Sequence, residues 1–567
     1  MRASLLGMTR GVLSTTLGIA VLCGNSCTGQ VSSGVQETAS HPVFPTGTGT
    51  AMGAQIEALL ADPGVSRAHW GIAVMAMDGT PIYGYDEGKF FRPASNAKLF
   101  TTAAAMALLG PDARVATKIY GDLDAKGTVH GDLTIVGAGD ANLASDDLPY
   151  VPPAQRPKGP QPQVVGLDDL RAMADQLVAK GVKRVTGRVV GDDQRFVYEP
   201  FADSWDVGDL VWGYGAPVSA LPIADNEMKL TVNPGTITGP KGHETYAPGA
   251  IVLEQNGVPY YTVTSQVEVT AAGTGSHVNV ERMPGSRVLR VYGSMAVDSH
   301  PDVEEVSIDD PAQYVAIALK QMLLERGVVV DGEATVSHKE MMDGRGFLSA
   351  VDAQPTTCED MTAAAGSTGS GLPACAVSCT VRAVPGALLA SHTSAPLAED
   401  ITLTLKVSQN LHAELLLPRM GDIGCGGSKV EGARMVRAFL VHAGLDPADF
   451  VFYDGSGLSG HDVVTPRATA QLLEYATKQP WFAQWKAALP VGGEDGTLAS
   501  RFPDAPLKDH LFAKTGTLGE SRGLSGYVDT ASGKQVIFSI FVDDHAPSGS
   551  TDRKVMDAIV AAIAASN

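Results

Sequence analysis

The chain has 567 residues, of which 44% are hydrophobic and 18% are charged, and its formal net charge is −20. This composition is typical of a globular protein with a real core and excludes wholesale disorder. The acidic balance, together with the lack of a Lys/Arg run that could neutralise a line of phosphates, argues against nucleic acid as a partner.

The N-terminus predicts an export signal followed by a tether. Arg2 and Arg10 precede a mostly apolar run at 11–23 that is too short to span a membrane and is typical of a signal peptide within residues 1–27. Residues 28–50 are rich in Thr, Ser and Gly, as in a flexible tether. A lipid-modified Cys27 stays open as an anchor. We therefore expect an exported protein, periplasmic or envelope-associated, with membrane contact only through this segment.

The next segment predicts a helix from about residue 51, strands at 71–77 and 81–85, and a second helix. Asp78-Gly79 between the strands is a common hairpin turn. Pro93 favours a helix start, and residues 98–109 are rich in Ala, Leu and Met before Gly110. The first helical turn would then hold both Ser95 and Lys98.

Residues from about 115 to 340 predict β-rich accessory structure. Short β-like runs occur at 133–136, 188–190, 229–232, 266–270 and 288–292, with helices predicted at 167–180 and 311–326. We expect inserted accessory domains over residues 116–385, including a nested β-rich subdomain at about 222–305. A further insertion at about 340–390 is rich in small residues and bears cysteines.

Four cysteines follow the predicted tether: Cys358, Cys375, Cys379 and Cys425. An even number in an exported chain favours disulfides, for which three connectivities are open. A zinc site is the competing interpretation, but the pair Cys375 and Cys379 has no second pair at finger spacing. We expect no metal.

The C-terminal part returns to a mixed α/β pattern. Helices are predicted at 397–417, 428–443, 468–477 and 552–564, and strands at 523–529 and 535–542. Because residues 51–110 have the same texture, we expect one discontinuous domain, 51–115 plus 386–567, interrupted by the insert.

Three short motifs carry the candidate chemistry: Ser95-Asn96-Ala97-Lys98, Ser408-Gln409-Asn410 and Lys514-Thr515-Gly516. Each alone is weak, since a lone Ser-x-x-Lys is more often a helix cap beside a surface lysine. At i and i+3, however, Ser95 and Lys98 share a helical face, which brings the amine within reach of the hydroxyl. The amine becomes a base if burial and positive neighbours such as Lys514 remove its proton.

A developing oxyanion needs donors, and two backbone groups are candidates. The N–H of Ser95 lies at a helix start, where it has no partner within the helix. The second donor would be the N–H of Thr517, on the strand that carries Lys514. We expect Gly516 to leave room for the substrate backbone.

Together the motifs resemble the signatures of penicillin-recognising serine enzymes. Flanking segments are similar to the penicillin-binding protein 4 type of D-alanyl-D-alanine carboxypeptidase/endopeptidase, in the low-molecular-mass class C: 131–134, 139–140, 187–196, 214–221, 454–459, 465–467 and 489–498. The resemblance implies an α/β (α+β) transpeptidase-like fold, an antiparallel sheet flanked by helices, with large β-rich inserts. It also implies an enzyme without a cofactor that cleaves peptidoglycan peptides and is acylated by β-lactams.

The resemblance also implies residue roles. Ser95 would be the acylated nucleophile, Lys98 its general base and Ser408 a proton relay towards the leaving amine. Asn410 would hold a substrate carbonyl or amide. The group Lys514, Thr515, Gly516 and Thr517 would bind the terminal carboxylate end of the substrate. Trp205 and Asp209 stand where the family recognises the amino end of diaminopimelate, although both could equally be structural.

Three other interpretations remain. A β-lactamase uses the same motifs, but its first two usually lie much closer in sequence than Ser95 and Ser408 do. A lipase-like elbow at Gly519-Glu520-Ser521-Arg522-Gly523 should be followed by a helix, whereas β-like sequence follows here. The third is a non-catalytic wall-binding protein of the same fold. Such a protein would not need the motif residues, and their presence here argues against it.

Overall fold

The computed structural model describes residues 42–145, 149–156, 166–342, 344–352, 383–424, 426–547 and 549–566. The predicted signal peptide, most of the tether, Cys27 and the four later cysteines lie outside these residues, so the disulfide prediction is not tested. Within the described ranges no helix is long and apolar enough to cross a membrane. The same ranges hold no group of three His, Cys, Asp or Glu that could bind a metal ion.

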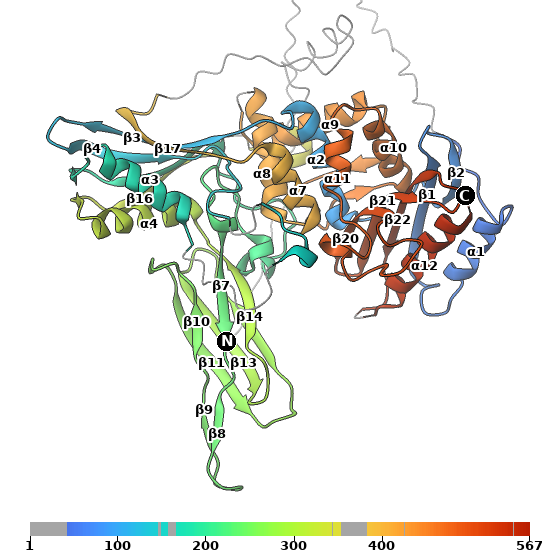
Figure 1. Cartoon of the computed structure of the whole chain (residues 1–567), viewed down its shortest axis with the longest axis horizontal. Helices are drawn as coiled ribbons and strands as arrows, with labels where there is room; N and C mark the ends of the chain where they lie inside the picture. Colours follow the sequence, from blue (N-terminus) through green and yellow to red (C-terminus); the bar gives the residue numbers. More distant parts are fainter. Residues whose placement is uncertain are drawn as a thin grey trace, which may run out of the picture. The chain divides into compact units, whose positions relative to one another are not determined.

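A five-stranded antiparallel sheet joins segments from both ends of the sequence. Its order is β2-β1-β22-β21-β20 (Figure 1). The strands are β1 (His69–Ala76), β2 (Pro81–Tyr85), β20 (Leu511–Leu518), β21 (Ser521–Asp529) and β22 (Gln535–Asp543). The hairpin predicted at Asp78-Gly79 joins β1 to β2, and Gly79 takes the positive φ that such a turn requires.

Both faces of this sheet are covered by helices. Along β1, Ile72 and Val74 pack into a cluster with α1 (Ala51–Leu60) and α12 (Thr551–Ser566), whereas Ala73 and Met75 pack into the cluster on the opposite face. This alternation follows from the two-residue period of a strand. The arrangement confirms the predicted antiparallel sheet flanked by helices.

The second face is covered by a helical layer that positions most of the motif residues. Its members are α2 (Ala97–Leu108), α7 (Leu397–Lys406), α8 (Asn410–Gly421), α9 (Lys429–His442), α10 (Pro466–Thr477) and α11 (Phe482–Ala487). Two short strands, β18 (Phe450–Val451) and β19 (Val463–Val464), pair beside it.

The single helix predicted over 397–417 is wrong. The structure has two helices, α7 and α8, separated at residues 407–409. Ser408 has φ +66°, a left-handed backbone that a right-handed helix cannot contain. Residues 397–417 contain no Gly or Pro, so the sequence pattern predicted one continuous helix across the break.

A seven-stranded sheet dominates the first part of the insert. Strands β15, β5, β4, β3 and β17 lie in this order, and β6 pairs with both β4 and β16. Their bounds are β3 (Ala116–Leu123), β4 (Thr128–Val136), β5 (Arg184–Val185), β6 (Val189–Val197), β15 (Val329–Val330), β16 (Ala334–Lys339) and β17 (Ala387–Thr393). Because β17 pairs with β3, the sheet extends past the predicted boundary at 385.

Smaller sheets fill the middle of the insert. One contains β7 (Glu227–Val232), β10 (Ile251–Leu253) and β14 (Asp302–Ser307); another contains β11 (Thr262–Thr270), β12 (His277–Glu281) and β13 (Val288–Ala296). The pair β8 (Thr236–Thr238) and β9 (Thr245–Ala247) forms a ribbon. A short helix, α5 (Phe347–Asp352), lies beyond β16.

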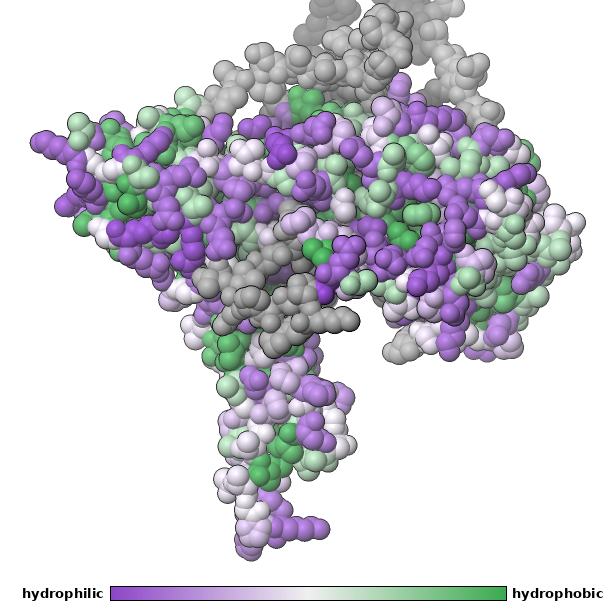
Figure 2. Space-filling model, in the orientation of Figure 1, coloured by the Kyte–Doolittle hydropathy of each residue, from purple (hydrophilic) through white to green (hydrophobic). Residues whose placement is uncertain are grey.

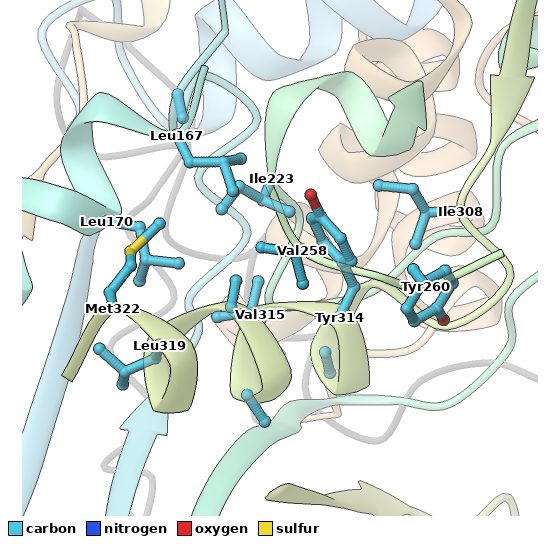
Figure 3. Close-up of a cluster of buried hydrophobic side chains, with 14 of the residues drawn as sticks. Leu167, Leu170, Ile223, Val258, Tyr260, Ile308, Tyr314, Val315, Leu319 and Met322 are labelled. Atoms are coloured by element: carbon cyan, nitrogen blue, oxygen red, sulfur yellow. The ribbon is translucent and has the colours of Figure 1, made fainter. Parts of the chain in front are cut away.

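The insert has its own hydrophobic core. Side chains of α4 (Pro311–Glu325), including Val315 and Leu319, lie in one buried cluster with Leu170 of α3 (Asp168–Ala179) and Ile223 (Figure 3). On the face of the molecule in Figure 2, hydrophilic and hydrophobic residues are interspersed. The insert is therefore a packed structure rather than a loop.

Candidate active site

Ser95 and Lys98 meet at the start of α2. Ser95 lies in the 3-10 turn η1 (Ala94–Asn96), immediately before the helix, and Lys98 lies in the first turn of α2. Lys98 Nζ donates a hydrogen bond to Ser95 Oγ at 2.9 Å. Ala94, just before the serine, has φ +47°, a strained backbone of the kind that clusters at functional sites.

Lys98 is fully buried and has two further acceptors. Its Nζ donates to Oδ1 of Asn410 at 2.6 Å and to the carbonyl O of Ser456 at 2.8 Å. A neutral amine has two N–H groups and one lone pair. In the charged form the third N–H is the one donated to Ser95 Oγ. When that proton is lost, Asn410 and Ser456 still accept the two remaining N–H groups, and the lone pair faces the Ser95 hydroxyl. This is the geometry of a general base.

Burial lowers the pKa of Lys98 to about 7, against the opposing effect of Asp454, Glu414 and Asp462. The sequence had predicted that positive neighbours such as Lys514 would help to lower it. The predicted repulsion between the two lysines is present, since the charge of Lys98 lowers the pKa of Lys514, but burial is the largest cause of the decrease at Lys98. The base is therefore poised near neutral pH.

Ser408 and Lys514 form a second contact across the site. Lys514, on β20, donates from Nζ to Ser408 Oγ at 2.9 Å and to the carbonyl O of Thr515 at 2.8 Å. Burial holds the pKa of Lys514 well below its ordinary value, and the charge of Lys98 lowers it further. The break between α7 and α8 is what turns Ser408 towards this lysine.

Asn410 is held from both ends of its amide. Oδ1 accepts from Lys98, and Nδ2 donates to the carbonyl O of Tyr214, in the insert, at 2.9 Å. Tyr214 in turn donates from its hydroxyl to Oδ1 of Asp209 at 2.9 Å. Tyr214 therefore lies between Asn410, which contacts its backbone, and Asp209, which contacts its side chain. Burial raises the pKa of Asp209.

β20 is the last strand of its sheet, and residues 490–492 bond to its outer side only along 511–513 within the described ranges. The N–H of Ala513 donates outward, away from β21, to the carbonyl O of Pro490. Because alternate residues of a strand point the same way, the N–H of Thr517 also points away from β21. This orientation suits the second oxyanion donor. The Thr515 hydroxyl is 2.7 Å from that of Thr497.

The model of the D-Ala-D-Ala carboxypeptidase 3 (S13) family matches residues 52–357 and 360–565. The chain belongs to this family. It is 31% identical over 524 residues to a D-alanyl-D-alanine carboxypeptidase of Actinomadura sp., covering 90% of this chain and 84% of that protein. It is 22% identical over 473 residues to D-alanyl-D-alanine carboxypeptidase DacB of Haemophilus influenzae, covering 82% and 83%.

The fold is also that of a solved relative. The crystal structure of penicillin binding protein 4 from Haemophilus influenzae aligns with a TM-score of 0.68 and 21% identity, covering 89% of this chain and 97% of that chain. A structure of the same protein complexed with a β-lactam aligns with a TM-score of 0.65 and 20% identity. The resemblance inferred from the motifs is thereby confirmed.

Within this S13 fold, Gly516 packs closely against the turn that carries Ser95. A Cβ at Gly516 would lie 2.7 Å from the carbonyl O of Pro93 and 2.9 Å from Nδ2 of Asn96. The missing side chain therefore makes room for the turn that carries Ser95, and its role towards the substrate backbone stays a prediction.

We expect Gly516→Ala to lower the unfolding free energy by about 1–3 kcal/mol and to slow acylation of Ser95, because the turn η1 must shift. Denaturant unfolding and labelled-penicillin kinetics measure the two effects. Gly460→Ala is the matched control, since a Cβ there has no heavy atom within 4 Å. Equal behaviour of the two variants would contradict the packing role.

The site also contains residues that sequence reasoning did not select. Oε1 of Glu414 accepts from the backbone N–H groups of Gly455 and Ser456, and Asp454 accepts from those of Gly457 and Ser459. These bonds hold the loop whose Ser456 carbonyl meets Lys98. The available signal was that Glu414 lies one helical turn after Asn410.

Trp205 belongs to the same support. Its Nε1 donates to Oδ2 of Asp454 at 2.9 Å, so its only polar group is already used. The lipase-like Ser521 is buried at the start of β21 and is followed by strand, not helix. The sequence-based rejection of that elbow agrees with this placement.

Proposed function

We propose that this S13 enzyme cleaves the terminal D-Ala-D-Ala bond of peptidoglycan peptides through an ester on Ser95. Lys98 takes the proton of the Ser95 hydroxyl as the oxygen attacks the carbonyl carbon. The contact that carries the proposal is Lys98 Nζ to Ser95 Oγ, with Asn410 and Ser456 accepting the remaining N–H groups. The tetrahedral oxyanion is stabilised by the N–H groups of Ser95 and Thr517.

In the proposed mechanism Ser408 completes the first half-reaction. The bond to the leaving D-alanine breaks, and its nitrogen takes, through the Ser408 hydroxyl that Lys514 contacts, the proton that Lys98 removed from Ser95, so Lys98 becomes neutral again. The charge of Lys514 and the hydroxyls of Thr515 and Thr517 bind the terminal carboxylate. Water then hydrolyses the ester and regenerates the Ser95 hydroxyl. A β-lactam presents a similar acyl group and carboxylate, so it acylates the same serine.

Cleavage of cross-links is a second proposed activity. When a D-Ala-diaminopimelate bond is cut, the leaving group is a diaminopimelate amine whose molecule carries further charged groups. A carboxylate of the enzyme on that side of the site would bind a positively charged group of the substrate. Asp209 is our candidate, because Tyr214 connects it to Asn410. The indole of Trp205 is committed to Asp454 and is not part of this proposal.

We further propose that the protein is exported and works in the cell envelope. Export is supported by Arg2 and Arg10 followed by the apolar run at 11–23, as in a signal peptide. A lipid-modified Cys27 would in addition anchor the exported protein to the membrane. For the domains, we propose a discontinuous catalytic domain, because strands near both ends of the sequence share one sheet. The pairing of β17 with β3 supports ending the insert after Thr393 rather than at 385.

Purified protein should release D-alanine from muropeptides with a pentapeptide stem, and should hydrolyse penicillin only slowly. After peptide cleavage the leaving amine departs and admits water, whereas an opened β-lactam stays attached beside the ester. Separation of digested muropeptides by chromatography, with D-alanine assayed in parallel, measures the first reaction. Loss of β-lactam absorbance measures the second.

The outcome that would contradict this proposal is rapid penicillin turnover with no D-alanine released and no cross-link cut. That result would make the protein a β-lactamase. A protein with neither activity nor acylation would be a non-catalytic wall-binding protein of the same fold.

A further inference from the structure

A buried charge bridge crosses the α7–α8 break beside the candidate site. His412, in the first turn of α8, has no exposed surface. Its Nδ1 lies 2.8 Å from Oδ1 of Asp400 on α7, and its Nε2 lies 2.7 Å from Oδ1 of Asp225 in the insert. One side chain therefore ties together three segments that are distant in sequence. None of these residues belongs to a sequence motif of the site.

The two contacts define the charge of the ring. An ionised carboxylate only accepts hydrogen bonds, so both nitrogens of His412 must carry a proton. Arg419 donates to the second oxygen of Asp400 at 3.1 Å, and the Ser145 hydroxyl donates to the second oxygen of Asp225 at 3.1 Å. Burial disfavours the imidazolium, but the two carboxylates outweigh it and raise the pKa of His412 to about 10.

The contact between Asp400 and His412 lies beside Ser408 and Asn410, which are at the break between α7 and α8. Asp400 precedes the break and His412 follows it, so their hydrogen bond spans the residues that leave the helical path. Ser408 holds its φ of +66° between these two anchors. Such a conformation is unfavourable for a residue with a Cβ and persists only where its surroundings hold it.

The arm to the insert is anchored in a similar way. Asp225 lies in the turn η5 (Ala224–Asn226), in which all three residues have positive φ. Side-chain bonds of Asn226 to the N–H of Ile223 and the carbonyl O of Pro217 hold this turn. The insert thus contacts the first turn of α8 at two points. Asp225 contacts His412, and the carbonyl O of Tyr214 accepts a hydrogen bond from Asn410.

We propose that His412 is a positioning residue: its bridge from Asp400 to Asp225 holds the α7–α8 break so that Ser408 and Asn410 face Lys514 and Lys98. The inference rests on the proposed acyl transfer at Ser95. It assigns the insert a part in the catalytic step, because one anchor of the bridge belongs to the insert. His412 itself touches no reacting atom.

The test is single-turnover acylation by a labelled penicillin of wild type, His412→Gln and His510→Gln. The last is a matched control, since His510 also contacts a carboxylate, Asp529, but is exposed. We expect His412→Gln to take up label at full stoichiometry with a saturating acylation rate constant about 10- to 100-fold lower, because the reacting groups are displaced. The half-saturating concentration should change little, and His510→Gln should behave as wild type.

A purely structural role gives a different pattern. It would lower the fraction of chains that take up label and leave the rate constant of the remainder unchanged, which would overturn the proposal. If His412→Gln yields no folded protein, Asp225→Ala removes one arm and keeps the bond to Asp400. It should slow acylation at least about threefold, and an unchanged rate constant would again overturn the proposal. Absence of label on Ser95 in the wild type would instead refute the proposed function.

Discussion

Ser95→Ala should form no covalent adduct with a labelled penicillin and should lose D-alanine release by about 10⁴-fold or more, because the hydroxyl that contacts Lys98 is removed. The lone pair of Lys98 would then have no proton to accept. Intact-protein mass measurement detects the adduct, and peptide mapping locates it on Ser95 in the wild type.

The control for this variant is Ser521→Ala, at the serine of the lipase-like pentapeptide. Ser521 is buried at the start of β21, with its hydroxyl 3.5 Å from Nη1 of Arg92. Its variant should be acylated at the wild-type rate. Label that persists in Ser95→Ala, or that maps to Ser521, would refute the assignment of the nucleophile.

Lys98→Met should slow acylation of Ser95 by about 10²- to 10⁴-fold while the serine remains in place, because the general base is lost. In the wild type only the neutral amine accepts the proton, and burial sets the pKa of Lys98 to about 7. Acylation should therefore rise about tenfold per pH unit below pH 7 and level off above it. In Lys98→Met the acylation rate should no longer rise with pH in this way.

The matched control is Lys478→Met, since Lys478 lies on the surface in an ion pair with Glu474. It should keep both the rate and the pH profile. Rate constants measured in stopped flow from pH 5 to 9 decide the matter. If the acylation rate of Lys98→Met still rises with pH as in the wild type, another group is the general base.

The α7–α8 break shows a limit of sequence patterns. Residues 397–417 have continuous helical periodicity, so a single helix was predicted, yet Ser408 takes a left-handed backbone between two helices. Its conformation is held by groups from elsewhere: Lys514 on β20 and the bridge from Asp400 to His412. A local pattern contains no record of such partners.

The polar surroundings of Lys98 show the same limit. Its contact with Ser95 follows from a spacing of three residues in one helical turn, and it was predicted. The acceptors Asn410 and Ser456 come from distant segments, and the role of Ser456 was not predicted. The carboxylates near Lys98 were not predicted either, because burial beside Asp454, Glu414 and Asp462 is a property of the packed core.

The sequence by itself determined the family, the three motifs and most of the predicted helices and strands around them, since these depend on residue types at short spacing. Only the tertiary structure decided how those motifs meet. It showed that Gly516 makes room for the turn of Ser95, that the Thr517 N–H points away from β21, and that the insert reaches α8 at His412. The physical reason is that burial, strand pairing and strained backbone arise from contacts between residues hundreds of positions apart, which local spacing does not encode.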